Sequence, residues 1–534
     1  MMDHADLVEA GTEGSATVAD GGLFGTPLFA DPGTHDLSRV GVIDIGSNSV
    51  RMVVFDGAAR SPAYFFNEKI LCGLGAGLAR TGRLSESGRV RALSALKRFA
   101  ALAKGMGVTT LLAVATAAMR EAEDGPAFRA EAERETGLTI HVVDGPEEAR
   151  LSAQGVLLGW PGAEGMVCDI GGSSMELAEL LGDGGVGRRA TSDLGPLKLQ
   201  GMTGGKKAIK AHIKTTIATL RDRFGDQSGR LFLVGGSWRA IARIDMERRG
   251  YPLKVLHEYR MTRSDIRATI AYIQKADLDA LRGQTGTSAD RMALVPLASL
   301  VLKELVRSFK PAEVAVSSYG IREGMLYEQM SDQQRQRDPL IEAAYQMELM
   351  SSRMPGFGRA LYLFIEPLFG RVTPAKKRVM RAACLLHDVS WRAHPDYRAE
   401  VCFDNATRAN LGGLKHSERV YLGLALLHRY KSSQKATGFD KLVSLLSEKD
   451  AKEAEILGRA MRFGAMLTLE RPLDHGALKY YPKKQILELR LLSDTGRDLF
   501  GEVAESRFKA LASALGANPV IKGVQTTRRA GQSG

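Results

Sequence analysis

The chain has 534 residues, of which 44% are hydrophobic and 25% charged. This balance is typical of a globular protein, and the length predicts about three or four domains. A membrane helix needs about 18 consecutive apolar residues. The best candidate, residues 292–306, is interrupted by Pro296, Lys303 and Glu304, so we expect no membrane span.

The formal net charge is +12, but it is unevenly distributed. Residues 1–38 contain seven of the 61 acids and neither Lys nor Arg, so the rest of the chain carries a net +19. Such a surface attracts polyanions, although a basic balance also serves solubility alone. The acidic leader 1–38 lacks the basic start and long apolar core of a signal peptide, so we expect it to be disordered.

The cysteines are Cys72, Cys168, Cys384 and Cys402, and they show no CxxC spacing. That spacing is the usual mark of a metal or redox site. Because most of the cysteines sit in apolar runs, we expect reduced thiols in the core and a cytoplasmic location.

The first predicted domain covers residues 39–152 and alternates strands with helices. Strand-like runs at 39–44 and 50–56 precede a helix of period 3.6 that Ser85 caps. A strand at 110–116, a short helix with Arg120, another helix and a strand at 139–144 follow. Pro146 then opens a helix at "GPEEARLSAQGVLLG". The pattern predicts an α/β domain.

The second predicted domain, residues 153–330, repeats this plan. Two strands flank a loop at Asp169, a helix at 205–224 has one apolar face, and a strand-to-helix unit at 313–328 closes the domain. The polar stretch 331–338 marks a boundary. Helical patterns dominate residues 331–512, and we expect the Gly-rich, basic end at 513–534 to be mobile.

Three loops with small residues and serine follow apolar runs in these two domains. They occur in "IDIGSNSVRM" at 43–52, "VCDIGGSSMELA" at 167–178 and "LFLVGGSW" at 231–238. Backbone N–H groups of such turns converge on anions, and serine hydroxyls add donors. An aspartate ahead of the loop is suited to hold Mg²⁺ against phosphate oxygens. The matching Asp-Ile-Gly loops indicate duplicated domains that bind phosphate.

Two further features allow more than one interpretation. Glu147 and Glu148 open a helix, where acids complement the helix dipole, but a carboxylate between two phosphate-binding domains can also activate water. Arg120 fits a solvated helix position or a bidentate phosphate clamp. Spacing alone leaves both choices open.

Taken in order, "IDIGSNSVRM", "ATAAMREA", "DGPEEARL", "DIGGSSMEL", "VGGSWRAIA" and "IREGMLYE" resemble the exopolyphosphatase and guanosine pentaphosphate phosphohydrolase family. The resemblance covers residues 39–330 and extends more loosely to about residue 510. It implies two duplicated ribonuclease H-like domains of the actin-like ATPase superfamily. An all-α, degenerate HD-like domain is expected to follow.

The resemblance also implies a role for each matching residue. Glu148 matches the catalytic base and Arg120 a phosphate-contacting arginine. The expected metal ligands are Asp44, Asp169 and Glu176, and the cofactor is Mg²⁺. The expected phosphate-binding residues are Gly46, Ser47, Asn48, Ser49, Gly171, Gly172, Ser173, Ser174, Gly236 and Ser237.

The sequence departs from the family pattern in the second loop. Ser173 replaces the usual third glycine, and Met175 stands where threonine is common. A positive φ at position 173 would strain the loop. In the helical region, His387-Asp388 lacks the further histidine that an HD-type metal site needs upstream, so we expect a structural pair there.

The predicted activity is Mg²⁺-dependent removal of terminal orthophosphate from inorganic polyphosphate, with water activated by Glu148. Lysines and arginines such as Lys206, Lys207, Lys376, Lys377 and Arg378 are candidates to line the chain's path. Hydrolysis of guanosine pentaphosphate to the tetraphosphate at the same site is the main alternative. A sugar kinase or ATPase and a non-catalytic alarmone- or polyphosphate-binding regulator are the others. The resemblance also implies a homodimer.

Overall fold

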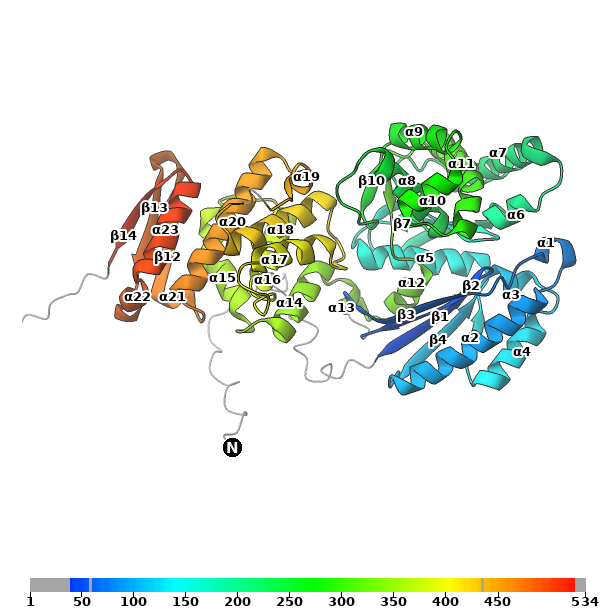
Figure 1. Ribbon diagram of the computed structural model, residues 1–534, viewed down its shortest axis with the longest axis horizontal. Helices are drawn as coiled ribbons and strands as arrows, with labels where there is room; N and C mark the ends of the chain where they lie inside the picture. Colours follow the sequence, from blue (N-terminus) through cyan, green and yellow to red (C-terminus); the bar gives the residue numbers. More distant parts are fainter. Residues whose placement is uncertain (1–38, 57–59, 434–436, 524–534) are drawn as a thin grey trace, which may run out of the picture.

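The computed structural model describes residues 39–56, 60–433 and 437–523. The predicted disordered leader, 1–38, lies outside the described residues. Two α/β lobes lie side by side at one end of the molecule, and the helical region extends from them along the long axis (Figure 1).

The first lobe is built on a five-stranded sheet of order β3-β2-β1-β4-β5. Strands β1, β2 and β3 are antiparallel neighbours, whereas β4 and β5 run parallel to β1. Its strands are β1 (Val40–Ile45), β2 (Ser49–Phe55), β3 (Tyr64–Leu71), β4 (Thr110–Ala115) and β5 (Ile140–Val142). Its helices are α1 (Leu78–Thr81), α2 (Glu86–Gly105), α3 (Ala117–Glu121) and α4 (Gly125–Thr136).

The second lobe has a six-stranded sheet of order β10-β11-β9-β6-β7-β8. Read from β8 to β11, its order and strand directions repeat those of the first sheet, and β10 adds an antiparallel edge. Its strands are β6 (Glu164–Ile170), β7 (Met175–Leu181), β8 (Val186–Ser192), β9 (Arg230–Val234), β10 (Tyr259–Met261) and β11 (Glu313–Val316). Its helices are α6 (Pro196–Gln200), α7 (Gly205–Phe224), α8 (Gly236–Arg248), α9 (Arg263–Ile273), α10 (Leu278–Thr285) and α11 (Ala289–Phe309). The repeated topology confirms the predicted duplication of an α/β domain.

Helices α5 (Gly145–Gly159) and α12 (Ile321–Glu328) pack against each other between the two lobes (Figure 1). Their crossing is close, since a side chain at Gly324 would meet the carbonyl oxygen of Leu151. The buried faces of both helices join residues from the two sheets in one apolar cluster. The predicted boundary between residues 152 and 153 falls inside α5, which serves both lobes.

The helical region begins with α13 (Asp332–Arg335) and has a large apolar core of its own. Its further helices are α14 (Pro339–Ser351), α15 (Phe357–Ile365), α16 (Pro374–Leu386), α17 (Arg398–Arg408), α18 (His416–Tyr430), α19 (Asp440–Val443), α20 (Glu448–Leu467) and α21 (Pro472–His475), with short 3₁₀ turns at Glu366–Leu368 and Pro482–Lys484. The helical domain predicted for residues 331–512 is therefore helical as far as residue 475.

The all-α prediction is wrong beyond that point. A three-stranded sheet of order β12-β13-β14 packs with α22 (Asp494–Leu499) and α23 (Glu502–Ala514). Its strands are β12 (Gly476–Tyr481), β13 (Ile486–Leu491) and β14 (Asn518–Lys522). Strand β14 lies in the predicted mobile tail, 513–534, of which residues 524–534 lie outside the described residues. It forms because it pairs with the buried strand β13, and Lys522 forms an ion pair with Glu488 at 2.7 Å.

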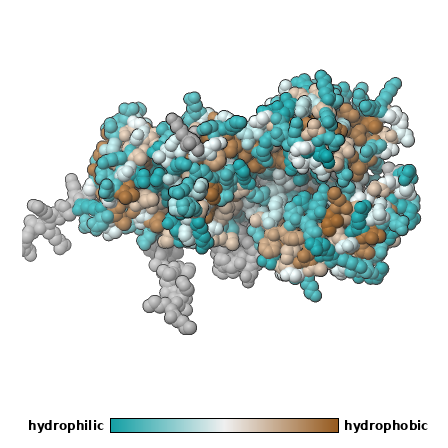
Figure 2. All heavy atoms as spheres, viewed as in Figure 1, coloured by the Kyte–Doolittle hydropathy of each residue, from teal (hydrophilic) through white to brown (hydrophobic). Residues whose placement is uncertain are grey.

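The absence of a membrane helix among the described residues and the state of the cysteines agree with the expectations from composition. No helix in the described part of the chain is both long and apolar enough to cross a membrane. The face in Figure 2 is largely hydrophilic with scattered apolar patches. All four cysteines are free and buried, which confirms the predicted core thiols.

Candidate active site

A cavity of about 220 Å³ lies between the two lobes, where the hairpin loops of β1–β2 and β6–β7 approach each other. The two loops close with the same backbone bond: Gly46 N–H donates to Ser49 O and Gly171 N–H to Ser174 O, each at 3.0 Å. Thirteen of the fifteen predicted site residues line this cavity. They are Asp44, Gly46, Ser47, Asn48, Ser49, Glu148, Asp169, Gly171, Gly172, Ser173, Ser174, Gly236 and Ser237.

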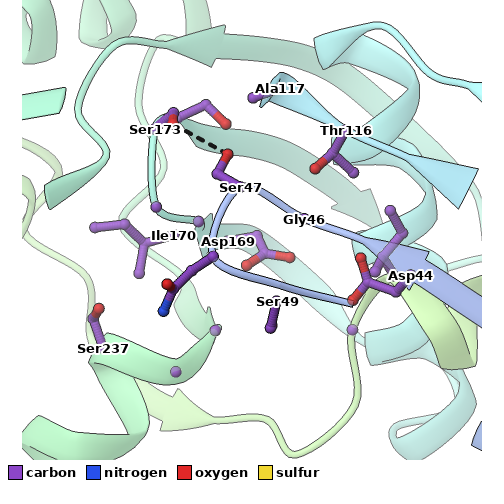
Figure 3. A pocket seen from close by; sticks show the side chains of 18 of the residues that line it. Asp44, Gly46, Ser47, Ser49, Thr116, Ala117, Asp169, Ile170, Ser173 and Ser237 are labelled. Atoms are coloured by element: carbon purple, nitrogen blue, oxygen red, sulfur yellow. Dashed lines mark hydrogen bonds between the residues drawn. The ribbon is translucent and has the colours of Figure 1, made fainter. Parts of the chain in front are cut away.

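Ser173 is not strained, contrary to the concern raised by its replacement of glycine. Among the described residues, the non-glycine positions with positive φ are Glu258, Lys310 and Gln485, so position 173 is not one of them. The Ser173 hydroxyl donates to the Ser47 hydroxyl at 3.1 Å, and Figure 3 shows this bond joining the two loops. The departure from the family pattern therefore adds a contact between the lobes.

The carboxylates of Asp44 and Asp169 occupy equivalent places at the ends of β1 and β6. Burial raises the pKa of both groups above the ordinary aspartate value. Arg322 opposes this shift at Asp44, to which its Nη1 lies 3.1 Å away, and the Ser152 hydroxyl opposes it by donating to Asp169. Two acids in one buried cavity favour a bound cation.

The two glutamates that open α5, Glu147 and Glu148, lie in different surroundings. Glu148 is buried at the start of α5 and lines the cavity. Burial raises its pKa to about 8, with Arg120 opposing the shift and Asp169 adding to it. Glu147 instead accepts hydrogen bonds from Arg150, one of them 2.8 Å long, outside the cavity. Of the two glutamates, Glu148 therefore lies in the cavity and Glu147 does not.

The other two predicted site residues, Arg120 and Glu176, do not line the cavity. Arg120 donates to the Val143 carbonyl at 2.8 Å and to Glu148 Oε2 at 3.3 Å, so in this structure it orients Glu148. Glu176 lies opposite Asp169 in the β6–β7 pair and accepts a 3.0 Å hydrogen bond from Thr191. Burial raises the pKa of Glu176 well above its ordinary value, and the neighbouring acids Glu148 and Asp169 add to the shift.

Five basic side chains also line the cavity, and none of them belongs to the predicted site. They are Arg51, Lys69, Arg239, Arg291 and Arg322. The strand register explains part of the set: Asp44 lies opposite Arg51, and Arg51 lies opposite Lys69, so the three form a row on one sheet face. In the strands "VRMVVF" and "YFFNEKIL", every second side chain points to the same face of the sheet. Which of these side chains lie opposite each other depends on the strand pairing, which the sequence does not give.

The other three arginines come from helices of the second lobe and from α12. A side chain at Gly236 would collide with the guanidinium of Arg291. Glycine at this position therefore leaves room for Arg291 beside the first residue of α8. The Nε atoms of Arg239 and Arg322 are buried without a hydrogen-bond partner among the described residues. Burial lowers the pKa of Arg239 to about 10 and that of Lys69 to about 8. Buried cations of this kind form charge-assisted hydrogen bonds with anionic oxygens.

The donor set fits Mg²⁺ at Asp44 and Asp169. Magnesium takes oxygen ligands, commonly one or two carboxylates completed by phosphate oxygens and water. Within the described residues no group of three His, Cys, Asp or Glu side chains is arranged to hold a metal, and Glu176 does not reach the cavity wall. If Mg²⁺ binds here, the protein would contribute two carboxylates, those of Asp44 and Asp169.

The His387-Asp388 pair has no metal-ligand cluster around it in the described residues. Arg353 donates to both carboxylate oxygens of Asp388, at 2.6 and 2.8 Å. Burial lowers the pKa of His387 to about 3, which keeps the ring neutral. An arginine thus neutralises Asp388, in agreement with the expected structural pair, while kinship of this region to HD domains is not confirmed.

Paired anion-binding loops, a carboxylate beside them and cations along one wall characterise enzymes that handle phosphoryl groups. The chain matches the sequence model of the Ppx/GppA phosphatase family over residues 53–333, and that of "Exopolyphosphatase, C-terminal" over residues 340–520. The chain therefore belongs to the Ppx/GppA phosphatase family, whose members are hydrolases.

Individual relatives are distant. "Exopolyphosphatase 1" of Mycobacterium tuberculosis is 25% identical over 326 residues, which are 57% of this chain and 92% of that protein. "Retrograde regulation protein 2" of Saccharomyces cerevisiae is 24% identical over 442 residues, which are 75% of this chain and 74% of that protein. The crystal structure of an exopolyphosphatase from Cytophaga hutchinsonii is 21% identical, with a TM-score of 0.49, and covers 54% of this chain and 97% of that one.

Proposed function

We propose that this protein is an exopolyphosphatase, which hydrolyses the terminal phosphoanhydride bond of inorganic polyphosphate. The observation that carries the proposal is the arrangement of charge around the cavity. The two loops and Glu148 form one part of its wall, and the row from Asp44 through Arg51 to Lys69 leads from there towards the edge strand β3. A linear polyanion suits the two cations of this row, because Arg51 and Lys69 can each meet a successive phosphate.

In the proposed reaction, backbone N–H groups and serine hydroxyls of the two loops hold the terminal phosphoryl group. Glu148 accepts a proton from the attacking water, and Arg120 keeps the Glu148 carboxylate in place through the bond at 3.3 Å. Arg239 and Arg322 stabilise the charge on the phosphoryl oxygens. Mg²⁺ at Asp44 and Asp169 would supply further neutralisation of the phosphate charge.

The direct test is orthophosphate release from long-chain polyphosphate by the purified protein, with and without added Mg²⁺. We expect turnover only with the metal present. A protein that releases negligible orthophosphate from polyphosphate under either condition contradicts the proposal.

The main alternative is hydrolysis of guanosine pentaphosphate to the tetraphosphate by the same groups. Its support is the family itself, which includes both activities, and kcat/KM for the two substrates measured side by side distinguishes them. A non-catalytic regulator remains the rival from another class, and it predicts ligand binding without turnover. The homodimer and the cytoplasmic location stay predictions.

A further inference from the structure

A second cavity, of about 470 Å³, lies on the other side of the two phosphate loops. It is bounded by the turn after β3 in the first lobe and by α6 in the second. Ser47, Asn48, Ser173 and Leu197 line both cavities, so the loops form a common wall. None of the five basic side chains of the first cavity lines the second.

The wall is joined across the lobes by the Ser173–Ser47 hydrogen bond of 3.1 Å. Each loop is separately anchored to its own lobe: Gly75 N–H donates to Ser47 O, and Leu197 N–H donates to Gly172 O, both at 2.8 Å. A small separation of the lobes can therefore break the hydroxyl contact while each loop keeps its own backbone support. This is the construction of a gate between rigid parts.

The charge of the second cavity differs from that of the first. It contains Arg80, Lys198 and Glu121, and Lys198 forms an ion pair with Glu121 at 3.3 Å that also crosses between the lobes. By formal charge the second cavity carries +1, from two basic groups and one acid, whereas the first carries +2, from five basic groups and the acids Asp44, Glu148 and Asp169. The first cavity therefore offers a phosphate more cationic partners, and the second attracts an anion more weakly. A weakly attractive cavity suits passage of an anion rather than its retention.

The order of groups along the substrate makes a second route useful. The basic row is formed by Arg51 and Lys69, next to Asp44. If a polyphosphate chain lies on this row, its terminal phosphoryl group is the innermost one and lies against the loops and Glu148. After hydrolysis, the shortened chain still fills the side through which it entered. Orthophosphate formed at the inner end then needs a route that does not cross the chain, and the second cavity adjoins that end through the loops that line both cavities.

We propose that orthophosphate leaves through the second cavity, past the Ser47–Ser173 contact, while the shortened chain remains on the basic row. This inference rests on the proposed polyphosphatase function. The ligand of the second cavity is inorganic phosphate in transit, and opening of the gate sets the rate of product release.

The test narrows the second cavity without touching the first. Gln200 lines the second cavity only, and it is exposed on α6, so Gln200→Trp adds bulk on the exit route. The matched control is Gln284→Trp, an exposed glutamine on α10 that lines neither cavity. Rapid-quench measurements with long-chain polyphosphate separate bond cleavage from phosphate release.

For Gln200→Trp we expect the first turnover to keep its wild-type rate, followed by a steady state slower by about tenfold, as for an enzyme limited by product release. The control keeps both wild-type rates. An active Gln200→Trp variant without a burst, or with cleavage slowed as much as steady-state turnover, overturns the exit route. A wild type that cleaves no polyphosphate overturns the proposed function and the exit route with it.

Discussion

The two hairpins that form the phosphate loops share a backbone but differ in the side chain opposite the aspartate. In the first lobe, Asp44 lies opposite Arg51, and in the second lobe Asp169 lies opposite Glu176. The first hairpin therefore carries a cation that faces the cavity, and the second carries a buried acid behind its wall. The duplicated lobes thus have equivalent turns, but the cross-strand position gives the first lobe a cation at the cavity and the second lobe an acid beside Asp169.

The largest effect is expected at the acid that lies between the hairpins. Glu148→Gln keeps the shape of the side chain but removes the base, so kcat should fall by about 10²–10⁴. Polyphosphate affinity, measured by equilibrium binding, should change little. Glu147→Gln, at the neighbouring acid outside the cavity, is the matched control and should keep near-wild-type kcat. Polyphosphate binding without detectable turnover, in the wild type as well as in Glu148→Gln, would favour the non-catalytic regulator.

The pH dependence of activity follows from the same group. Because burial raises the pKa of Glu148 to about 8, its basic form grows as pH rises. Below that pKa, kcat should fall about tenfold for each pH unit, since only the ionised carboxylate accepts a proton from water. Measuring kcat at saturating Mg²⁺ from pH 6 to pH 9.5 checks this, and a bound cation should move the limb to lower pH. Activity that declines as pH rises through this range contradicts the assignment.

The cation of the first hairpin should affect substrate capture. Arg51→Met removes one charge from the row beside Asp44, and a hydrogen bond to a charged group is worth about 1.5–3 kcal/mol, so kcat/KM should fall about tenfold or more. The effect should be larger for long chains than for triphosphate and smaller at high salt. Lys275→Met, at an exposed lysine that lines neither cavity, is the control. An equal loss for all chain lengths would mean that Arg51 does not contact the chain beyond its end.

Much of this comparison could be predicted from the sequence. The Asp-Ile-Gly loops identified both hairpins, because turn residues and strand alternation are local properties. Glu148 was found through its motif, and Ser85 as the cap of α2, where it accepts from Gly88 N–H at 3.2 Å. Helix α7 buries Ile213 and Ile217 as its period indicated.

The basic wall could not be found in this way, because it depends on contacts between distant segments. Arg291 reaches the loops from α11, and Arg322 from α12. Conversely, the candidate path residues Lys376, Lys377 and Arg378 form ion pairs with Asp450, Glu366 and Asp338 within the helical region. Strand β13 was missed although "ILELRL" alternates, since its pairing with β14 lay in a stretch interpreted as a tail.

The acid of the second hairpin should affect stability in a pH-dependent way. The pKa of Glu176 is raised in the folded protein, so the unfolded carboxyl ionises first as pH rises above about 4.5, and folded stability then declines until the folded group ionises. Glu176→Gln removes this decline. The difference in Tm between variant and wild type should grow from pH 5 to pH 9, as measured by thermal unfolding. Melting temperatures that differ by the same amount at every pH would show that Glu176 is ionised in the folded state.

The smallest effect is expected where the two hairpins meet. Ser173→Ala removes the hydroxyl that donates to Ser47 but keeps the backbone of the loop. A neutral hydrogen bond contributes about 0.5–1.5 kcal/mol, so kcat/KM for polyphosphate should fall about two- to tenfold.

Ser173→Gly separates two explanations for that loss. If the hydroxyl contact alone matters, the glycine variant should match the alanine variant. If loop stiffness matters, glycine should cost more because it widens the conformations open to the loop. Should the Ser47–Ser173 contact gate phosphate release, both variants would keep or exceed the wild-type release rate in rapid-quench experiments while losing affinity for the chain. A release rate that falls in both variants would make the contact a support of the loop and not a gate.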